Sequence, residues 1–154
     1  MGDRTYVTLT VRRADKKRVL QICEEAGYEP NEPDQSPEIT AFVNMGFEEV
    51  NYGMLPFLDE LEKAGIPFDS NWAAGCEYTE GTRYGRYNSA GELVFAELYE
   101  EDFAIWIDDL MRVIHDYTEL TSLIRERYAC VQTPSWDEQE HNAKLFQTKQ
   151  LITQ

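Results

Sequence analysis

Residues 5–11, TYVTLTV, place Val7, Leu9 and Val11 at every second position, and this stretch constrains the fold more than any other. Successive side chains of a strand point to opposite faces, so the three aliphatic residues share one face. The stretch therefore predicts a β-strand with one buried face. Apolar residues over 19–26 then recur at helical spacing and predict a helix after this strand.

The other elements follow from the same two periodicities and from turn residues. Residues 28–38 hold three prolines and predict a loop, whereas residues 38–45 predict a second strand. Residues 47–52 are either a third strand or an irregular extension. Further along, the sequence predicts a helix over 54–65, a loop over 69–75, a hairpin formed by 76–88 and 92–99, a helix over about 101–128 with a break near Tyr117, and a last helix that begins at Ser135.

This order of elements predicts the α+β class: a mainly antiparallel β-sheet covered by helices, with a helical C-terminal region. A ferredoxin-like arrangement is one option for the N-terminal part. No repeat, low-complexity tract or shift in composition divides the chain, so we expect a single domain over residues 1–154. Residues 133–154 are a candidate peripheral C-terminal helix.

Charge is distributed unevenly along the sequence. The chain carries 29 acids and 14 bases, which gives a formal net charge of −15. Residues 1–18 are net +4, residues 19–110 net −18 and residues 111–154 net −1. Such an excess disfavours nucleic acid and anionic membranes as partners and favours a cationic protein surface. The basic cluster at residues 12–18 is expected to be solvated or to pair with the chain's own acids.

Residues 99–119 combine many acids with many apolar side chains. On one helix the apolar residues form a single stripe at three- and four-residue steps, which predicts a core-facing side. The stripe consists of Phe103, Trp106, Ile107, Leu110, Val113, Ile114 and Tyr117. Six carboxylates fall on or near a second face: Glu101, Asp102, Asp108, Asp109, Asp116 and Glu119. That face is either an ordinary solvated helix surface or an anionic ridge that binds a partner.

Aromatic residues supply further candidates for contact with a partner. Tyr84 and Tyr87 lie close to two arginines, and tyrosine and arginine dominate the energetics of many protein interfaces. We take Tyr84, Tyr87 and Trp72 as candidate partner-binding residues. The tyrosines alternatively form cross-strand pairs within a twisted hairpin.

Signals for catalysis are weak. The sequence has no EF-hand loop, no CxxC pair, no phosphate-binding glycine loop and no G-x-S-x-G motif. We expect no catalytic residue, no metal site and no cofactor. Three cysteines, an odd number, favour a reducing compartment over a disulfide framework, and no run has the length of a signal peptide or a membrane span. We therefore expect a cytoplasmic protein.

In size and charge the chain is similar to small acidic inhibitors of mobile-element origin, such as anti-CRISPR and anti-restriction proteins that mimic DNA. It is equally similar to immunity proteins that neutralise cationic toxins. This similarity, which covers no alignable stretch, implies a non-enzymatic inhibitor that occupies a positively charged, nucleic-acid-binding site on another protein. Two alternatives stay open: a small enzyme or ligand-binding domain with a pocket near Trp72, Cys76 and Tyr78, and a homodimer formed through Trp136 and Phe146.

Overall fold

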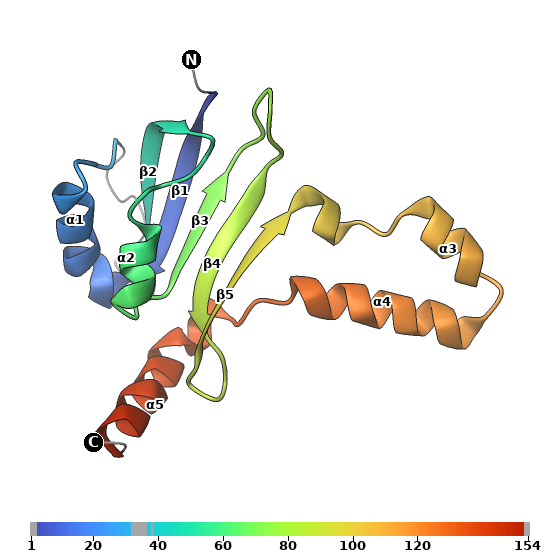
Figure 1. The fold of residues 1–154 in the computed structure, drawn as a ribbon. Helices are drawn as coiled ribbons and strands as arrows, with labels where there is room; N and C mark the ends of the chain where they lie inside the picture. Colours follow the sequence, from blue (N-terminus) through green and yellow to red (C-terminus); the bar gives the residue numbers. More distant parts are fainter. Residues whose placement is uncertain (1–2, 32–36, 38, 153–154) are drawn as a thin grey trace.

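A five-stranded antiparallel sheet forms the centre of the molecule (Figure 1). The computed structural model describes residues 3–31, 37 and 39–152, so part of the predicted 28–38 loop and the first residue of the predicted second strand lie outside the described residues. The sheet has the order β2-β1-β3-β4-β5. The strands are β1 (Arg4–Arg12), β2 (Phe42–Asn51), β3 (Phe68–Trp72), β4 (Gly81–Tyr87) and β5 (Leu93–Tyr99).

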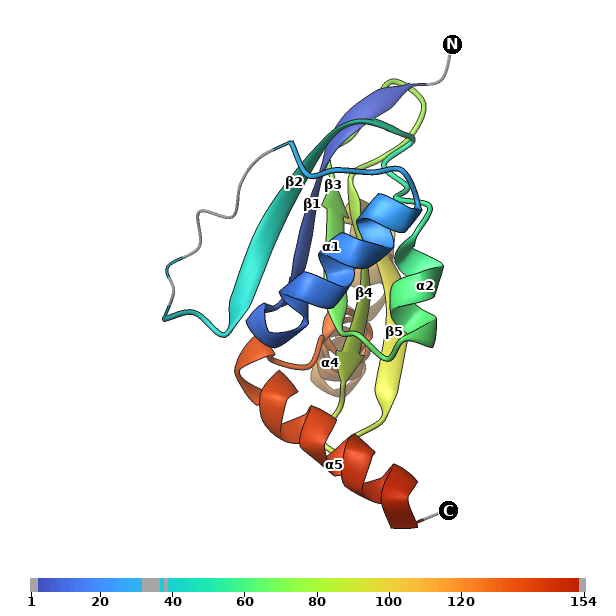
Figure 2. The ribbon, with the colours of Figure 1, turned by 90° about the vertical axis from the view of Figure 1, so that its left-hand side faces the viewer.

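One face of this sheet is covered by α1 (Lys16–Glu25) and α2 (Leu58–Lys63), which Figure 2 shows in front of the strands. A short 3-10 turn, η1 (Arg13–Asp15), leads from β1 into α1. Val7, Leu9 and Val11 are fully buried under these helices, which confirms the predicted strand and its buried face. The core also contains Val19, Ile22, Cys23, Val43, Met45, Phe47, Phe57, Leu61 and Phe68.

Fold class is as predicted, α+β with an antiparallel sheet, but two details differ. The predicted loop at residues 69–75 is wrong at its start, because β3 includes Asp69, Ser70 and Asn71. Both β2 and β3 run antiparallel to β1, so the path β2-α2-β3 is a split β-α-β unit with β1 between its strands. A ferredoxin-like order is not reached, because β1 and β2 are direct neighbours.

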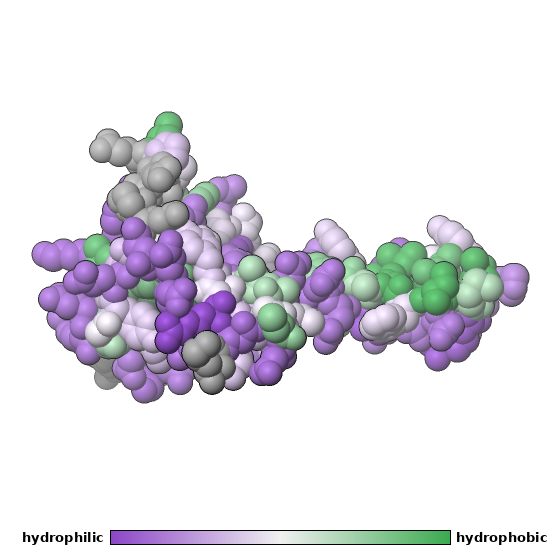
Figure 3. All heavy atoms as spheres, turned by 90° about the horizontal axis from the view of Figure 1, so that it is seen from above, coloured by the Kyte–Doolittle hydropathy of each residue, from purple (hydrophilic) through white to green (hydrophobic). Residues whose placement is uncertain are grey.

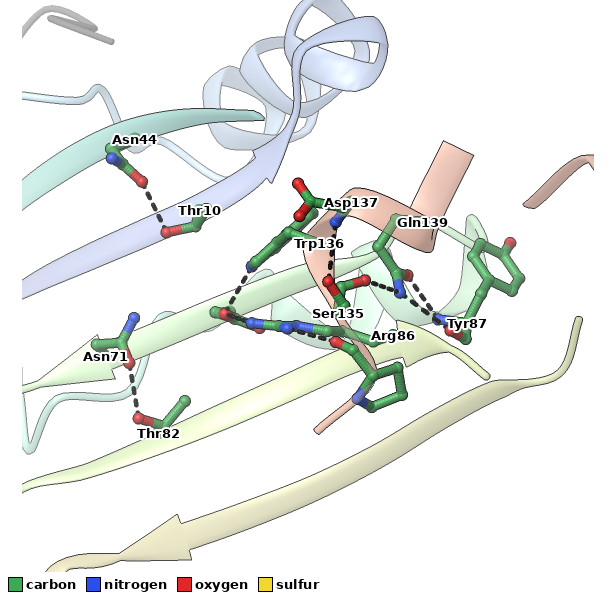
Figure 4. Close-up of polar contacts among 12 residues, drawn as sticks. Thr10, Asn44, Asn71, Thr82, Arg86, Tyr87, Ser135, Trp136, Asp137 and Gln139 are labelled. Atoms are coloured by element: carbon green, nitrogen blue, oxygen red, sulfur yellow. Dashed lines mark hydrogen bonds and ion pairs between the residues drawn. The ribbon is translucent and has the colours of Figure 1, made fainter. Parts of the chain in front are cut away.

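The C-terminal segment places η3 (Trp136–Glu138) against the second face of the sheet, and α5 (Gln139–Ile152) packs at the end of β4, with Phe146 against Tyr87. As Figure 4 shows, the guanidinium of Arg86 donates to both carboxylate oxygens of Asp69, and its third nitrogen donates to the carbonyl of Pro134. The Trp136 indole donates to the same carboxylate at 3.0 Å and lies 4.7 Å from the Arg86 guanidinium carbon. This buried ion pair fixes the entry into α5.

A side-chain amide holds the start of α5 on the sheet. Gln139 is completely buried; it accepts a hydrogen bond from the Tyr87 backbone N–H at 2.7 Å and donates to the Tyr87 carbonyl at 3.0 Å (Figure 4). Ser135 accepts from the Asp137 N–H, so the predicted helix start at Ser135 is confirmed. Residues 135–143 are thus part of the packed body.

Residues 100–131 leave the body as a separate projection, which we call the arm (Figures 1 and 3). It consists of η2 (Glu100–Phe103), α3 (Ile107–Val113) and α4 (Tyr117–Val131), and α4 packs back against α3 and η2. The predicted break near Tyr117 is confirmed, but the prediction of continuous helix from 101 to that break is wrong. The helical segments are separated at 104–106 and again at 114–116, where Asp116 caps α4 by accepting from the N–H groups of Thr118 and Glu119.

Among the described residues, no helix has the length and apolar character that crossing a membrane requires.

The three cysteines differ in exposure, which gives a direct check of the core. Cys23 of α1 is fully buried, and this burial raises the pKa of its thiol to about 12, whereas Cys76 and Cys130 are exposed. Because the thiolate is the reactive form, a disulfide reagent is expected to modify Cys76 and Cys130 in the native protein and Cys23 only after denaturation. Absorbance of the released thiol would measure this; rapid reaction of all three would contradict the burial of Cys23.

Candidate functional site: a projecting helical arm

The arm exposes large apolar side chains along both of its helices. On α3, Ile107 and Met111 are 69% and 57% exposed, and on α4, Tyr117 and Tyr128 are 83% and 64% exposed. Figure 3 shows hydrophobic residues gathered on the outer half of the arm. Four further side chains are at least about half exposed: Phe103, Trp106, Ile114 and Ile124.

These residues are exposed because the arm has no core of its own. All of residues 100–131 are described, and Val113 is the one buried residue among them. Leu110 and Leu120 are half-buried, and the helices are too short to enclose more. The predicted stripe from Phe103 to Tyr117 is therefore not a core face. Its periodicity is real, but most of it faces outward.

The predicted anionic ridge is divided among three elements. Asp102 lies in η2 and accepts a hydrogen bond from the Tyr99 N–H at 2.8 Å. Asp109 lies on α3 and contacts the guanidinium groups of Arg112 and Arg127 at 3.2 and 3.8 Å. Asp116 is the cap of α4. These three carboxylates support the arm's structure, so the seven-residue spacing does not produce one row of free charges.

Three other predicted carboxylates are available to a partner. Glu101, Asp108 and Glu119 are exposed, and their side chains form no ion pair with any described residue. Over residues 100–131 there are eight acids and three arginines, so the arm has a net charge of −5. It therefore combines an apolar surface with uncompensated negative charge.

The predicted aromatic contacts are mostly internal. Tyr84 and Tyr87 are 6% and 3% exposed, because β4 is an inner strand and the Tyr87 hydroxyl donates to the Gly65 carbonyl after α2. Neither ring is available to a partner, contrary to the expectation. Trp72 is half-buried at the end of β3, and it lines a shallow pocket together with Glu100 and Phe103 at the base of the arm. Trp136 and Phe146, the aromatics of the homodimer alternative, contact Phe42 and Tyr87 within the chain.

The N-terminal bases pair partly with the chain's own acids, one of the two outcomes expected for them. Arg4 contacts Glu49 at 2.7 Å and Arg12 contacts Asp15 at 2.5 Å. Arg13 donates to the carbonyl groups of Thr40 and Pro37. These contacts leave the acids of the arm uncompensated.

The surroundings of Cys76 give little support to the alternative in which this chain is a small enzyme. The Cys76 backbone N–H donates to the carboxylate of Asp3, and the thiol is exposed. His115 lies on the arm and His141 on α5, so neither is placed as a base beside it. Among the described residues, no three His, Cys, Asp or Glu side chains cluster as metal ligands would.

Comparison with known proteins identifies no family model, no curated protein and no solved structure that matches this chain. What the arm does is therefore inferred from its own residues. Four of the six predicted acids are exposed, whereas Asp102 and Asp109 are half-buried, and the sequence missed the exposure of Met111, Ile124 and Tyr128. Burial of a helical stripe depends on whether another element covers it, and periodicity does not report this.

Proposed function

We propose that the chain is a non-enzymatic acidic binding protein that uses its arm to occupy a positively charged site on another protein. The observation that carries this proposal is the combination, on one projecting element, of exposed aromatic side chains and a net charge of −5. Aromatic residues and methionine are enriched at protein interfaces, and exposed apolar patches mark them. Negative charge around that surface favours a cationic partner.

The size of the apolar surface supports a specific complex. Phe103, Trp106, Tyr117 and Tyr128 are each more than 60% exposed. At about 150–250 Å² for each ring, they alone expose roughly 400–700 Å². One side of a typical stable interface buries about 800 Å², and the largest patch on a monomer is usually about 300–600 Å². The aliphatic residues of the arm bring its surface into the range of a full interface.

A nucleic-acid-binding protein is the partner that we propose. Such proteins present basic surfaces to phosphates, and carboxylates on the arm can replace those phosphates. Binding there would exclude nucleic acid and so inhibit the partner, as expected of an anti-CRISPR or anti-restriction type of inhibitor acting in the cytoplasm. A cationic toxin neutralised by an immunity protein is the alternative partner with the same charge. Duplex DNA distinguishes the two, because it would displace the chain only from a nucleic-acid site.

Neutralising the free acids of the arm tests the electrostatic part of this proposal. The partner is first captured from cell lysate on the immobilised full chain at low salt. We expect Glu101→Gln, Asp108→Asn and Glu119→Gln together to weaken binding to this captured partner at least tenfold at low salt, since each exposed contact contributes up to about 1 kcal/mol. The loss should shrink as salt screens the charges. Surface plasmon resonance at two ionic strengths would measure both effects.

A matched control separates the arm from total charge. Glu24→Gln, Glu48→Gln and Glu77→Gln change the net charge equally, and all three residues are exposed on the body. This variant should bind nearly as well as the unaltered protein. Equal losses from both triple variants would mean that overall charge, and not the arm, determines association.

A further inference from the structure

Four aromatic rings from separate segments line a small cavity on the body, next to the base of the arm. Tyr52 comes from the turn after β2, Trp72 from the end of β3, Tyr78 from the β3–β4 loop and Tyr99 from the end of β5. They form two edge-to-face pairs, Tyr52 with Tyr78 and Trp72 with Tyr99, each with ring centroids 6.0 Å apart. The cavity measures about 210 Å³ and opens to solvent.

Trp72 is held rigidly in this cavity. Its indole N–H donates to the Thr79 carbonyl at 3.0 Å. Gly53 and Gly81 approach the ring so closely that an added Cβ would lie 2.5 Å from an indole carbon at either position. The indole therefore has one position available, and the cavity wall that it forms exists before any ligand arrives.

Tyr52 also occupies an enforced position. Its φ of 53° lies in the left-handed region, which is uncommon for a bulky residue. The turn is closed by the hydrogen bond from the Met54 N–H to the Asn51 carbonyl at 3.1 Å. Backbone conformations of this kind are found more often at binding sites, where they set the direction of one side chain. Here the turn places the Tyr52 ring beside Tyr78.

The charged groups at the cavity favour a cation. Arg83 lines the cavity, but its guanidinium contacts three carboxylates, those of Asp59, Glu62 and Glu97. These four side chains together carry a net negative charge. Glu97 is the cavity-lining carboxylate among them, and it accepts from the Tyr99 hydroxyl at 3.1 Å. Burial, followed by the hydrogen bond to Glu97, raises the pKa of Tyr99, so its phenol stays neutral at physiological pH. The Tyr78 hydroxyl oxygen is buried and has no hydrogen-bond partner among the described residues.

We propose that this cavity binds an alkylated ammonium group, such as the trimethylammonium of choline or of a methylated lysine side chain. Aromatic rings attract cations through the negative charge of their faces, and quaternary ammonium groups lose little hydration on entering. Ordinary ligand pockets measure about 300–1,000 Å³, so this cavity suits a compact headgroup and not a larger molecule. No residue that lines the site belongs to the arm, although Tyr99 directly precedes it, and the proposal does not depend on the arm's proposed partner.

Calorimetric titration of the full chain with choline and with a trimethyllysine peptide tests the proposal. At least one of them should bind saturably to one site. The neutral carbon analogue of choline, 3,3-dimethylbutanol, should bind at least tenfold more weakly, because it keeps the shape but lacks the charge. A peptide-only response identifies a protein side chain as the source of the group, and a choline-only response identifies a free small molecule.

Variants assign the binding to the cavity. Glu97→Gln and Tyr52→Ala should each weaken binding about tenfold; both residues are exposed enough for the fold to survive. Tyr128→Ala on the arm, a matched change to another exposed tyrosine, should leave binding unaltered. The proposal is overturned if neither ammonium compound binds, if the neutral analogue binds equally well, or if Glu97→Gln and Tyr128→Ala behave alike.

Discussion

Replacing Arg86 by methionine is expected to lower the free energy of unfolding by about 3–5 kcal/mol, because the Asp69 carboxylate would then be buried without its cation. The side chains of Arg86 and Asp69 are 10% and 12% exposed, so water cannot replace the lost donor. Of the hydrogen bonds that the described residues donate to the Asp69 carboxylate, the one from the Trp136 indole would remain. Urea unfolding followed by circular dichroism would measure the change.

Arg112→Met is the matched control for this prediction. Arg112 forms an ion pair with Asp109 on the arm, but its side chain is 71% exposed. Exposed pairs contribute between about 0 and 1 kcal/mol, so the change should be small. Similar losses from the two arginine variants would contradict a specific role of burial at Arg86. The double variant Asp69→Leu/Arg86→Met should be less destabilised than Arg86→Met alone, because no buried charge then lacks its partner.

Excising the outer arm is expected to abolish partner binding while the body stays folded. Residues 104–131 would be replaced by a glycine–serine linker, which is feasible because α4 returns to pack against η2. The main hydrophobic core contains no residue of the arm, so the free energy of unfolding should change by about 1 kcal/mol or less, as for changes outside buried features. Affinity for the captured partner should fall more than a hundredfold, since interface aromatics each contribute about 2–4 kcal/mol.

A charge-preserving variant shows which feature of the arm matters. Trp106→Ala with Tyr117→Ala keeps every carboxylate and removes two rings that are 63% and 83% exposed. We expect it to lose at least tenfold in affinity, chiefly through faster dissociation. If excision leaves binding unaltered, the arm is not the interface; if excision unfolds the body, the arm is part of its stability.

The local sequence pattern correctly predicted the elements in which the buried side chains recur at the period of a strand or of a helix. The strand at 5–11, the helix after it and the cap at Ser135 are of this kind, and so is the hairpin, although its first strand begins at Gly81 and not at Cys76. The misassigned segment, 69–75, starts with residues that are depleted in strands. Asp69 is accommodated there because Arg86, seventeen positions later, lies diagonally across on β4, two residues beyond Tyr84, which is opposite Asp69, and neutralises the carboxylate. Such a pairing between distant residues has no local signal.

For the arm, the sequence predicted the composition but not its geometry. The break near Tyr117 was predicted, and Asp116, a residue type that often begins a helix, caps α4 there. The earlier division at 104–106 was not predicted, so the seven-residue spacing of acids was wrongly placed on one helix. Exposure of the apolar residues was not readable, because a helix that faces a core and one that faces a partner have the same periodicity.

The position of β1 in the sheet bears on how the chain folds during synthesis. The strand made first lies between β2 and β3, so its hydrogen bonds are complete only once Trp72 has been added. At about 5–20 residues per second, the ribosome needs roughly 3–12 s to extend the chain from Val11 to that point. During these seconds Val7, Leu9 and Val11 lie in a strand that does not yet have β3 beside it. We expect a ribosome-associated chaperone to bind the nascent chain at this stage.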